Sequence, residues 1–319
     1  MILSVGIITY NHASFIRQCL DSVLMQKVDF DFEIVVGDDG SVDGTQEVLK
    51  EYQGLYPNKI VLLLNDKNEG ISKNYKNVLT RCRGKYVALC EGDDYWTAED
   101  KLQKQVEFLE SHKEYGFVGA YSHLLFPDGR IQEDNYEFMP KPVVEDGWEL
   151  YGDVFDYAKY GPVTRTVSLC FRRSIIEPYL QYEGLGNDMV LQTVLAKHSW
   201  FAKNILPMTI YRQGGVSTDV YSFEKEIYYN DWYVGNRLLQ KNLFPNDCNW
   251  DEDELLDRGA YIRIRHAVQK NDWRTAVGQK RLLRTNKYRK KIYSRLVFGP
   301  ISCFLLSVMI GNQMKWKNL

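Results

Sequence analysis

Two pairs of neighbouring aspartates stand directly after apolar runs and could hold a cation. Asp38 and Asp39 follow one run, and Asp93 and Asp94 follow another, with Glu91 two residues before Asp93. Carboxylate oxygens suit Mg²⁺ or Mn²⁺, which share their coordination with water and substrate phosphates. Aspartate is also an ordinary turn residue, and one pair alone would favour that interpretation. Two pairs in equivalent places favour a site for a divalent cation and an anionic ligand.

Short β-rich runs separated by helical patterns must position these acids. The runs cover residues 3–8, 32–36, 60–64 and 86–90. Strands that alternate with helices of ten or more residues predict an α/β fold with a mostly parallel sheet. The run 60–64 is apolar throughout, which predicts a strand buried on both faces.

Polar clusters follow three of these runs, at Thr9–Asn11, Asp38–Ser41 and Glu91–Asp94. In open parallel sheets, ligands bind at the carboxyl ends of the strands. We therefore expect the three clusters to meet at one edge of one sheet.

The pattern changes beyond residue 117. We expect strands at 117–126 and 166–171, with an irregular, aromatic-rich stretch at 130–165 between them. Helical patterns cover 221–240 and 251–285. There is no internal repeat.

Composition places the chain among globular proteins. Of the 319 residues, 45% are hydrophobic and 26% are charged, which excludes disordered, collagen-like and coiled-coil chains. Mean hydropathy is -0.38, which excludes a polytopic membrane protein. The six cysteines include no CxxC pair, so we expect neither structural zinc nor a disulfide framework, and a reducing compartment fits. We see no signal peptide, and we expect a cytoplasmic protein.

The C-terminal part is strongly basic. Residues 258–319 carry 15 lysines and arginines against one acid, whereas 1–257 carry 25 against 41. Residues 296–311 are uncharged, but they are fewer than the roughly 20 that a bilayer-spanning helix needs. A basic stretch beside an apolar one predicts contact with the inner face of the cell membrane through 287–311. The alternative is a basic helical layer that packs on protein.

Four motifs resemble family 2 glycosyltransferases, in the family's order and within about the first hundred residues. They are Ser4–Asn11, Glu33–Thr45, Asn68–Ser72 and Glu91–Trp96. The resemblance implies a GT-A fold, with a glycosyltransferase domain at 1–217 and a basic helical extension at 218–319. Within the domain, it implies a nucleotide-sugar-binding half at 1–115 and an acceptor half at 116–217.

The resemblance also implies roles for individual residues. Asp93, with Glu91 where the family has an aspartate, would hold Mn²⁺ or Mg²⁺. Asp39 would read the uracil edge of a UDP-sugar, since a carboxylate accepts from an N–H group. Other side chains would line the donor nucleotide pocket: Thr9, Tyr10, Asn11, Asp38, Asn68 and Asp94. Lys73 follows the loop Asn68–Ser72 and would face the nucleotide, with a solvent-facing side chain as the alternative.

Asp188 is the candidate general base, because it begins a helical pattern as an aspartate does in the family. A helix-capping role also suits this position. The segment Tyr211–Ser217 resembles a family landmark that would form a loop over the donor phosphates, with Arg212 as a phosphate partner. A surface or salt-bridged arginine is the alternative. The five histidines show no ligand spacing, and we interpret them as structural or surface residues.

These residues together predict an inverting, metal-dependent glycosyltransferase. The expected acceptor is a glycan or a polyprenyl-linked oligosaccharide in bacterial surface polysaccharide synthesis, and we expect no nucleic-acid partner. A nucleotidyltransferase would need a Gly-rich basic loop after the first strand, where Thr9–His12 stands instead. A non-catalytic sugar-nucleotide-binding protein is disfavoured by the complete carboxylate set. A Rossmann dehydrogenase lacks its GxGxxG motif here.

Overall fold

The protein divides into two compact units, Met1–Asp219 and Val220–Leu319. The structure, a computed structural model, describes residues 1–134, 139–181, 188–214, 223–248, 250–269, 272–280 and 283–284.

The first half of the first unit alternates strands and helices, as the sequence predicts. Its elements are β1 (Leu3–Thr9), α1 (Ile16–Leu24), β2 (Phe32–Asp38), α2 (Thr45–Leu55), β3 (Ile60–Leu64), α3 (Ile71–Arg81), β4 (Tyr86–Glu91), β5 (Tyr95–Trp96) and α4 (Lys101–Ser111).

The second half of this unit has shorter elements. They are β6 (Tyr115–Leu125), β7 (Ile131–Glu133), β8 (Val143–Glu145), β9 (Trp148–Gly152), α5 (Phe155–Ala158), the 3-10 turn η1 (Thr166–Ser168), β10 (Cys170–Arg172), η2 (Arg173–Ile176), α6 (Glu177–Gln181), α7 (Asp188–His198) and β11 (Trp200–Arg212).

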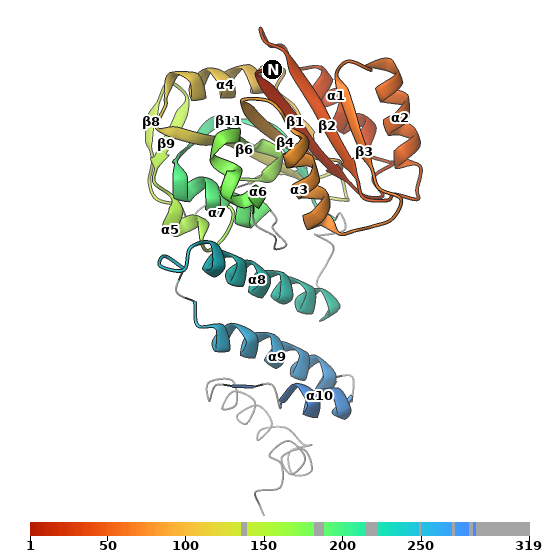
Figure 1. The fold of residues 1–319 in the computed structure, drawn as a ribbon, viewed down its shortest axis with the longest axis vertical. Coiled ribbons are helices and arrows are strands. Elements are labelled where there is room, and N and C mark those ends of the chain that lie inside the picture. Colours follow the sequence, from red (N-terminus) through yellow and green to blue (C-terminus); the bar gives the residue numbers. More distant parts are fainter. Residues whose placement is uncertain are drawn as a thin grey trace, which may run out of the picture. The chain divides into compact units, whose positions relative to one another are not determined.

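One mixed sheet runs through the unit in the order β3-β2-β1-β4-β10-β6-β11-β9-β8 (Figure 1). The strands β3, β2, β1 and β4 pair in parallel, which confirms the predicted parallel core. From β4 onward most pairings are antiparallel, because β10 enters between β4 and β6 in the opposite direction. The strands β6 and β11 then pair in parallel again.

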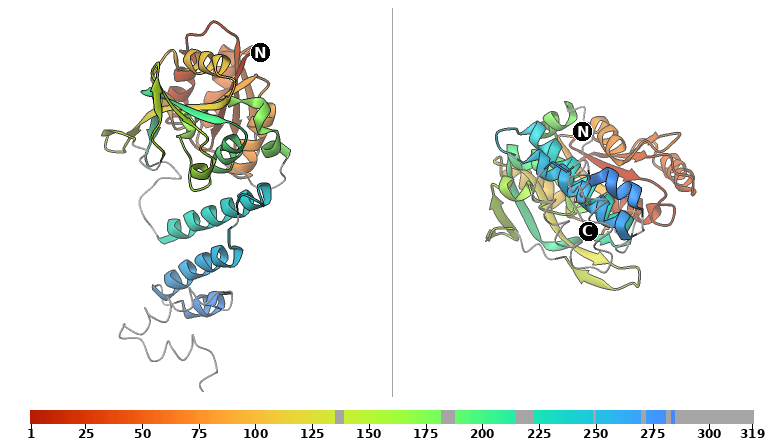
Figure 2. Two further views of the ribbon diagram at one scale, coloured as in Figure 1. Left: turned by 90° about the vertical axis from the view of Figure 1, so that its left-hand side faces the viewer. Right: turned by 90° about the horizontal axis from the view of Figure 1, so that it is seen from below.

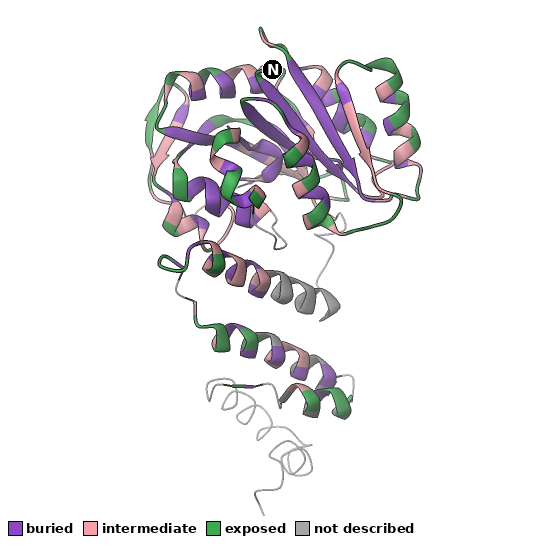
Figure 3. Ribbon diagram, in the orientation of Figure 1, coloured by how far each residue is buried: buried purple, intermediate pink, exposed green. Residues whose placement is uncertain are grey.

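Helices cover both faces of the parallel part of the sheet (Figures 1 and 2). Alternate residues of β1, including Leu3 and Val5, pack with the apolar stripes of α1, α2 and α4 in the main core. The opposite face contacts α3, and β1, β2 and β4 are buried almost throughout (Figure 3). Gly37 permits this close approach, since a Cβ there would lie 2.4 Å from Asn74 Oδ1 and 2.5 Å from Val78 Cγ2.

Several sequence predictions in this unit were wrong. The strand 60–64 lies at the sheet edge and pairs only with β2, so Ile60 is buried while its other residues are half-buried. The stretch 130–165 contains β7, β8, β9 and α5. The strand expected at 166–171 is a 3-10 turn followed by β10. The sequence analysis did not anticipate β11.

The second unit contains α8 (Phe223–Leu243), α9 (Glu252–Gln269) and α10 (Trp273–Lys280). The helix expected over 251–285 is thus divided into two. Among the residues that the structure describes, no helix combines the length and apolarity that crossing a bilayer requires. The segment 287–311, for which we predict membrane contact, lies outside the described residues.

Candidate active site

The three polar clusters meet at the carboxyl ends of β1, β2 and β4. Thr9 is in register with Asp38, and Ile8 is in register with Glu91. The backbone continues this pairing past the strands, because Asp39 N donates to Thr9 O at 3.0 Å and Gly92 N donates to Ile8 O at 2.9 Å. The Thr9 hydroxyl is buried, and no residue in the described part of the chain hydrogen-bonds to it.

Asn11 and Asp38 tie the first two clusters together. Asn11, in the left-handed region at φ 56, accepts from Val42 N at 3.0 Å and donates its own N–H to Ser41 Oγ at 2.8 Å. Asp38 accepts from Ser41 N at 3.0 Å and from Gln46 Nε2 at 2.7 Å, and it also binds the Ser41 hydroxyl. Tyr10, in the first cluster, is half-buried.

Asp39 holds the loop that leads into α3. Its carboxylate accepts from Asn65 Nδ2 at 3.0 Å, from Glu69 N at 2.8 Å and from Gly70 N at 2.9 Å. The residue is only 2% exposed. A carboxylate offers about four acceptor positions, so roughly one remains for a ligand. Asp39 is thus first a loop anchor.

Asn68 and Lys73 belong to this loop and to the first turn of α3. Asn68 Oδ1 accepts from Gly70 N at 3.0 Å, and Lys73 forms an ion pair with Glu69 at 2.8 Å. The Lys73 side chain is 53% exposed. Its charge is therefore balanced locally and faces solvent.

Four acidic side chains gather after β4 and at the start of α7. Burial raises the pKa of Glu91 well above its usual range, and the charges of Asp188 and Asp93 raise it further. Burial, followed by the charges of Asp93 and Glu91, likewise raises the pKa of Asp94. The structure thus brings Asp188 within electrostatic range of Glu91, although 97 residues separate them in sequence.

This carboxylate set fits a divalent cation that also takes ligands from its substrate. Asp94 Oδ2 and Glu91 Oε2 are buried, and no N–H or O–H group of the described residues donates to them, as expected of oxygens that could coordinate a cation. In the described parts of the chain, no group of three or more His, Cys, Asp or Glu side chains could hold a metal on its own. A cation here would therefore need oxygens from water or phosphate, as Mg²⁺ commonly does.

Arg212 is the last residue of β11 and is fixed from several sides. Its backbone N–H donates to Asp94 Oδ1 at 2.8 Å, and its guanidinium binds the Gln18 side chain. The guanidinium also lies 4.9 Å from the Phe15 ring centroid and 5.1 Å from that of Tyr95. The prediction of a loop at 211 and 212 was wrong, since both residues are in the strand. Residues 215–217 lie outside the described ones.

Asp188 begins α7 and is half-buried. Its Oδ2 accepts from Thr166 Oγ at 3.0 Å. Burial raises the pKa of this carboxyl, while the Thr166 hydrogen bond acts in the opposite direction. Residues 184–187, which precede Asp188 in the predicted motif, lie outside the described part.

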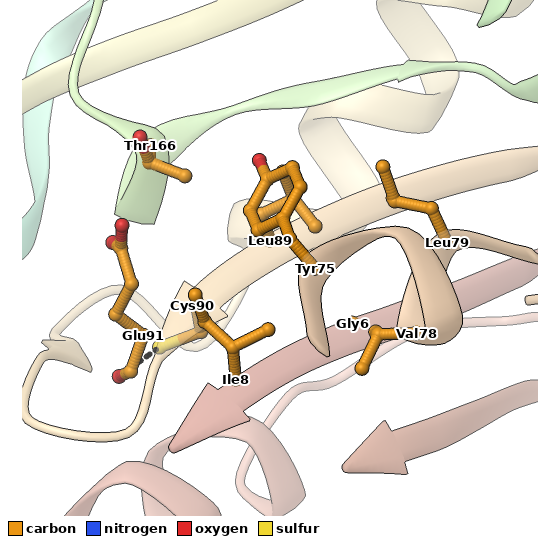
Figure 4. A pocket seen from close by; sticks show the side chains of 9 residues that line it. All are labelled: Gly6, Ile8, Tyr75, Val78, Leu79, Leu89, Cys90, Glu91 and Thr166. Carbon is orange, nitrogen blue, oxygen red and sulfur yellow. Dashed lines mark hydrogen bonds between the residues drawn. The ribbon is translucent and has the colours of Figure 1, made fainter. Parts of the chain in front are cut away.

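A narrow pocket adjoins the acidic cluster, between α3 and the sheet. Figure 4 shows Glu91 and Thr166 at one end of it, with Tyr75 towards the middle. The hydroxyls of Tyr75 and of Tyr179, which is on α6, are buried and have no hydrogen-bond partner among the described residues. Ile8, Val78, Leu79 and Leu89 make the rest of the lining largely apolar.

Sequence reasoning missed three side chains at this site. His12 Nε2 lies 3.9 Å from Asp93 Oδ2, and its position beside the Thr9–Asn11 cluster was a usable signal. Arg165 is paired with Asp134 at 2.5 Å, lies 4.7 Å from the Tyr211 ring and lowers the pKa of Glu91. Thr166 carries no local signal, since only the fold brings it to Asp188.

The family model for glycosyl transferase family 2 matches residues 4–171, which is more than half of the chain. The chain belongs to this family.

Curated relatives share the first part of the chain. The teichuronic acid biosynthesis glycosyltransferase TuaG of Bacillus subtilis, itself described as putative, is 35% identical over 145 residues, which cover 44% of this chain and 55% of TuaG. An uncharacterised protein of Mycobacterium tuberculosis is 39% identical over 127 residues, which cover 40% and 37% of the two chains. The matched region thus spans about two fifths to just over half of these relatives.

Solved structures confirm the expected GT-A fold. TarS of S. aureus, in complex with UDP-GlcNAc, has a TM-score of 0.55 at 16% identity and covers 97% of this chain and 88% of its own. The mannosyltransferase PcManGT of Pyrobaculum calidifontis, in complex with GDP-Man and Mn²⁺, has a TM-score of 0.50 at 16% identity. It covers 99% of this chain and 88% of its own.

Proposed function

We propose that this chain is an inverting glycosyltransferase that moves a sugar from a UDP-sugar to a hydroxyl of a glycan or lipid-linked acceptor. The observation that carries the proposal is a pair of buried carboxylate oxygens, on Glu91 and Asp94, to which no N–H or O–H group of the described residues donates. Both carboxylates lie after β4, within electrostatic range of Asp93. Their arrangement suits a diphosphate bound together with a cation. The UDP complexes of the neighbour TarS support a uridine donor.

Asp93 and Glu91 would hold Mn²⁺ or Mg²⁺. When bound, the cation supplies positive charge that stabilises the departing diphosphate. Arg212 would add a second positive charge near the phosphates, and its fixed backbone keeps Asp94 in place. The remaining donor contacts that we propose come from the strand-end clusters and the loop before α3: Thr9, Tyr10, Asn11, Asp38, Asp39, Asn68 and Asp94. Lys73, in the first turn of α3, would exchange its ion pair with Glu69 for a contact with the donor.

Asp188 would act as the general base. Its carboxylate takes the proton of the acceptor hydroxyl while the acceptor oxygen bonds to the anomeric carbon. The bond from that carbon to the phosphate oxygen breaks on the opposite side, which inverts the configuration. Support comes from its place at the start of α7, where its charge acts on Glu91 of the proposed cation site.

The acceptor is proposed to belong to surface polysaccharide synthesis, as the name of TuaG suggests for that relative. Peripheral contact with the membrane through 287–311 stays a prediction. Sedimentation with anionic liposomes at low and high salt tests it, and failure to bind at low salt would contradict it.

The decisive experiment measures UDP release from a panel of UDP-sugars with and without Mn²⁺, first for the wild-type protein and then for Asp188→Asn. We expect one UDP-sugar to be preferred and Mn²⁺ to be required. The rate of UDP release should fall by about 10²–10⁴-fold in the Asp188→Asn variant. UDP affinity should stay nearly unchanged. A chain that neither binds UDP in the presence of Mn²⁺ nor turns over any UDP-sugar would refute the proposal.

A further inference from the structure

Thr166 is the side chain that hydrogen-bonds the Asp188 carboxylate among the residues that the structure describes. Its hydroxyl donates to Asp188 Oδ2 at 3.0 Å. Thr166 is 5% exposed and lines the same pocket as Glu91, so the Asp188 carboxylate is held next to the other acidic side chains. Because its hydroxyl fixes Oδ2, Thr166 limits the orientations that the carboxylate can take.

The turn that carries Thr166 is anchored to the segment that carries the metal motif. Trp96 Nε1 donates to Val167 O at 2.8 Å, and Gln105 Nε2 donates to Ser168 O at 2.8 Å. Both bonds are buried. Lys101, which is wholly buried, donates to Gln105 Oε1 at 2.9 Å and lies 4.0 Å from the Trp96 ring.

The helix that carries Asp188 is anchored to the residues just before the Thr166 turn through Gln192, one turn further along α7. Gln192 Oε1 accepts from Val163 N at 2.9 Å and from Thr164 N at 3.2 Å, and Gln192 Nε2 donates to Thr164 O at 3.1 Å. Gln192 is fully buried. Its amide therefore fixes the helix against the residues that lead directly into Thr166.

We propose that Thr166 is a positioning residue for Asp188, and that Gln192 keeps α7 in register with the Thr166 turn. Together they hold one carboxylate oxygen of the base in a single orientation relative to the donor site. Such control matters because a misplacement of about 1 Å can cost about 10²-fold in rate. The inference rests on the proposed function, since it assigns a partner to the proposed base.

The test compares Thr166→Val, which removes the hydroxyl but keeps the side-chain shape, with Thr166→Ser, which keeps the hydroxyl. We expect kcat for the preferred UDP-sugar to fall by about 10-fold or more in the valine variant, with donor KM within about twofold of wild type. The serine variant should keep a kcat within about threefold of the wild-type value. Thr166→Ala provides a second hydroxyl deletion if the valine variant fails to fold.

Thr193→Val is the matched control. Thr193 also lies on α7 and is fully buried, and its hydroxyl donates to Met189 O at 2.9 Å and to Ala158 O at 3.1 Å. Its loss should lower the melting temperature without lowering kcat. Gln192→Leu should lower both the melting temperature and kcat, because it removes the hydrogen bonds that join α7 to residues 163 and 164.

Four results would overturn the proposal. Valine and alanine variants of Thr166 that keep wild-type kcat would show that the hydrogen bond has no positioning role. A serine variant as impaired as the valine variant, or a Thr193→Val loss of kcat equal to that of Thr166→Val, would show a merely structural effect. Asp188→Asn is measured alongside: if it retains transfer, the assignment of the base fails and the positioning role fails with it.

Discussion

Replacing Asp39 by asparagine removes an acceptor from a side chain that already holds three donors. The best orientation of the amide keeps its oxygen where Oδ1 accepts from Asn65 and Glu69, and turns its NH₂ group towards Gly70 N–H. One charge-assisted bond is lost, and two buried donors then face each other. We expect a loss of about 2–4 kcal/mol in the free energy of unfolding.

Thermal unfolding measures this loss, because about 1 kcal/mol corresponds to roughly 2–4 °C for a unit of this size. The melting temperature of Asp39→Asn should therefore fall by roughly 5–15 °C. UDP affinity, followed by calorimetry with Mn²⁺, should fall as well, since the loop before α3 loses its anchor. Asp66→Asn is the matched control, because Asp66 is an exposed carboxylate in the same loop.

A variant Asp39→Asn that loses UDP binding at an unchanged melting temperature would contradict the role of Asp39 as a loop anchor. That outcome would make Asp39 a direct reader of the base, with no measurable contribution from its loop contacts. Equal effects of Asp66→Asn would show instead that the charge of the loop matters rather than the three hydrogen bonds.

Three further predictions concern the cation site, the sheet and a buried lysine. Asp93→Asn should raise the Mn²⁺ concentration for half-maximal UDP release by at least about tenfold. The melting temperature should not fall, because the substitution also removes the repulsion between Asp93 and Asp94. An unchanged Mn²⁺ dependence would contradict this prediction. Gly37→Ala should lower the free energy of unfolding, measured by chemical denaturation, by about 1–3 kcal/mol, because its Cβ would clash with α3. Gly54→Ala, on α2, should not lower it, because a Cβ there meets open space. Burial lowers the pKa of Lys101 from 10.5 to about 8, so between these pH values only the unfolded chain binds the proton and stability rises with pH. The stability of Lys101→Met relative to wild type should therefore fall by up to about 3 kcal/mol from pH 7 to pH 10.5, and a flat difference in denaturation curves would disprove it.

The alternation of strands and helices over the first hundred residues was readable from sequence, because it depends on local periodicity. Apolar runs such as 32–36 and 86–90 become strands at nearly the predicted positions. Parallel pairing then requires that the residues after each strand meet at one edge. The proximity of Asp38 to Thr9 follows from these local patterns alone, and so does that of Glu91 to Ile8.

The strand β11 was not readable, because polar residues interrupt its pattern and the fold supplies their partners. Lys203, which is 2% exposed, has its ammonium group 3.8 Å from the centroid of the Tyr121 ring. Thr209 shares a buried hydrogen bond of 2.7 Å with Ser122. Both partners lie on β6, more than 80 residues earlier. Sequence spacing contains no information about such distant pairs.

The acid residues and their approximate places were thus determined by the sequence itself, through strand ends and motif order. Only the tertiary structure decided what each carboxylate contacts: Asp39 anchors a loop, Asp94 fixes the end of β11, and Asp188 receives the Thr166 hydroxyl. The physical reason is that secondary structure depends on neighbours a few residues apart. Burial and hydrogen bonding at the site depend on segments that only the folded chain brings together.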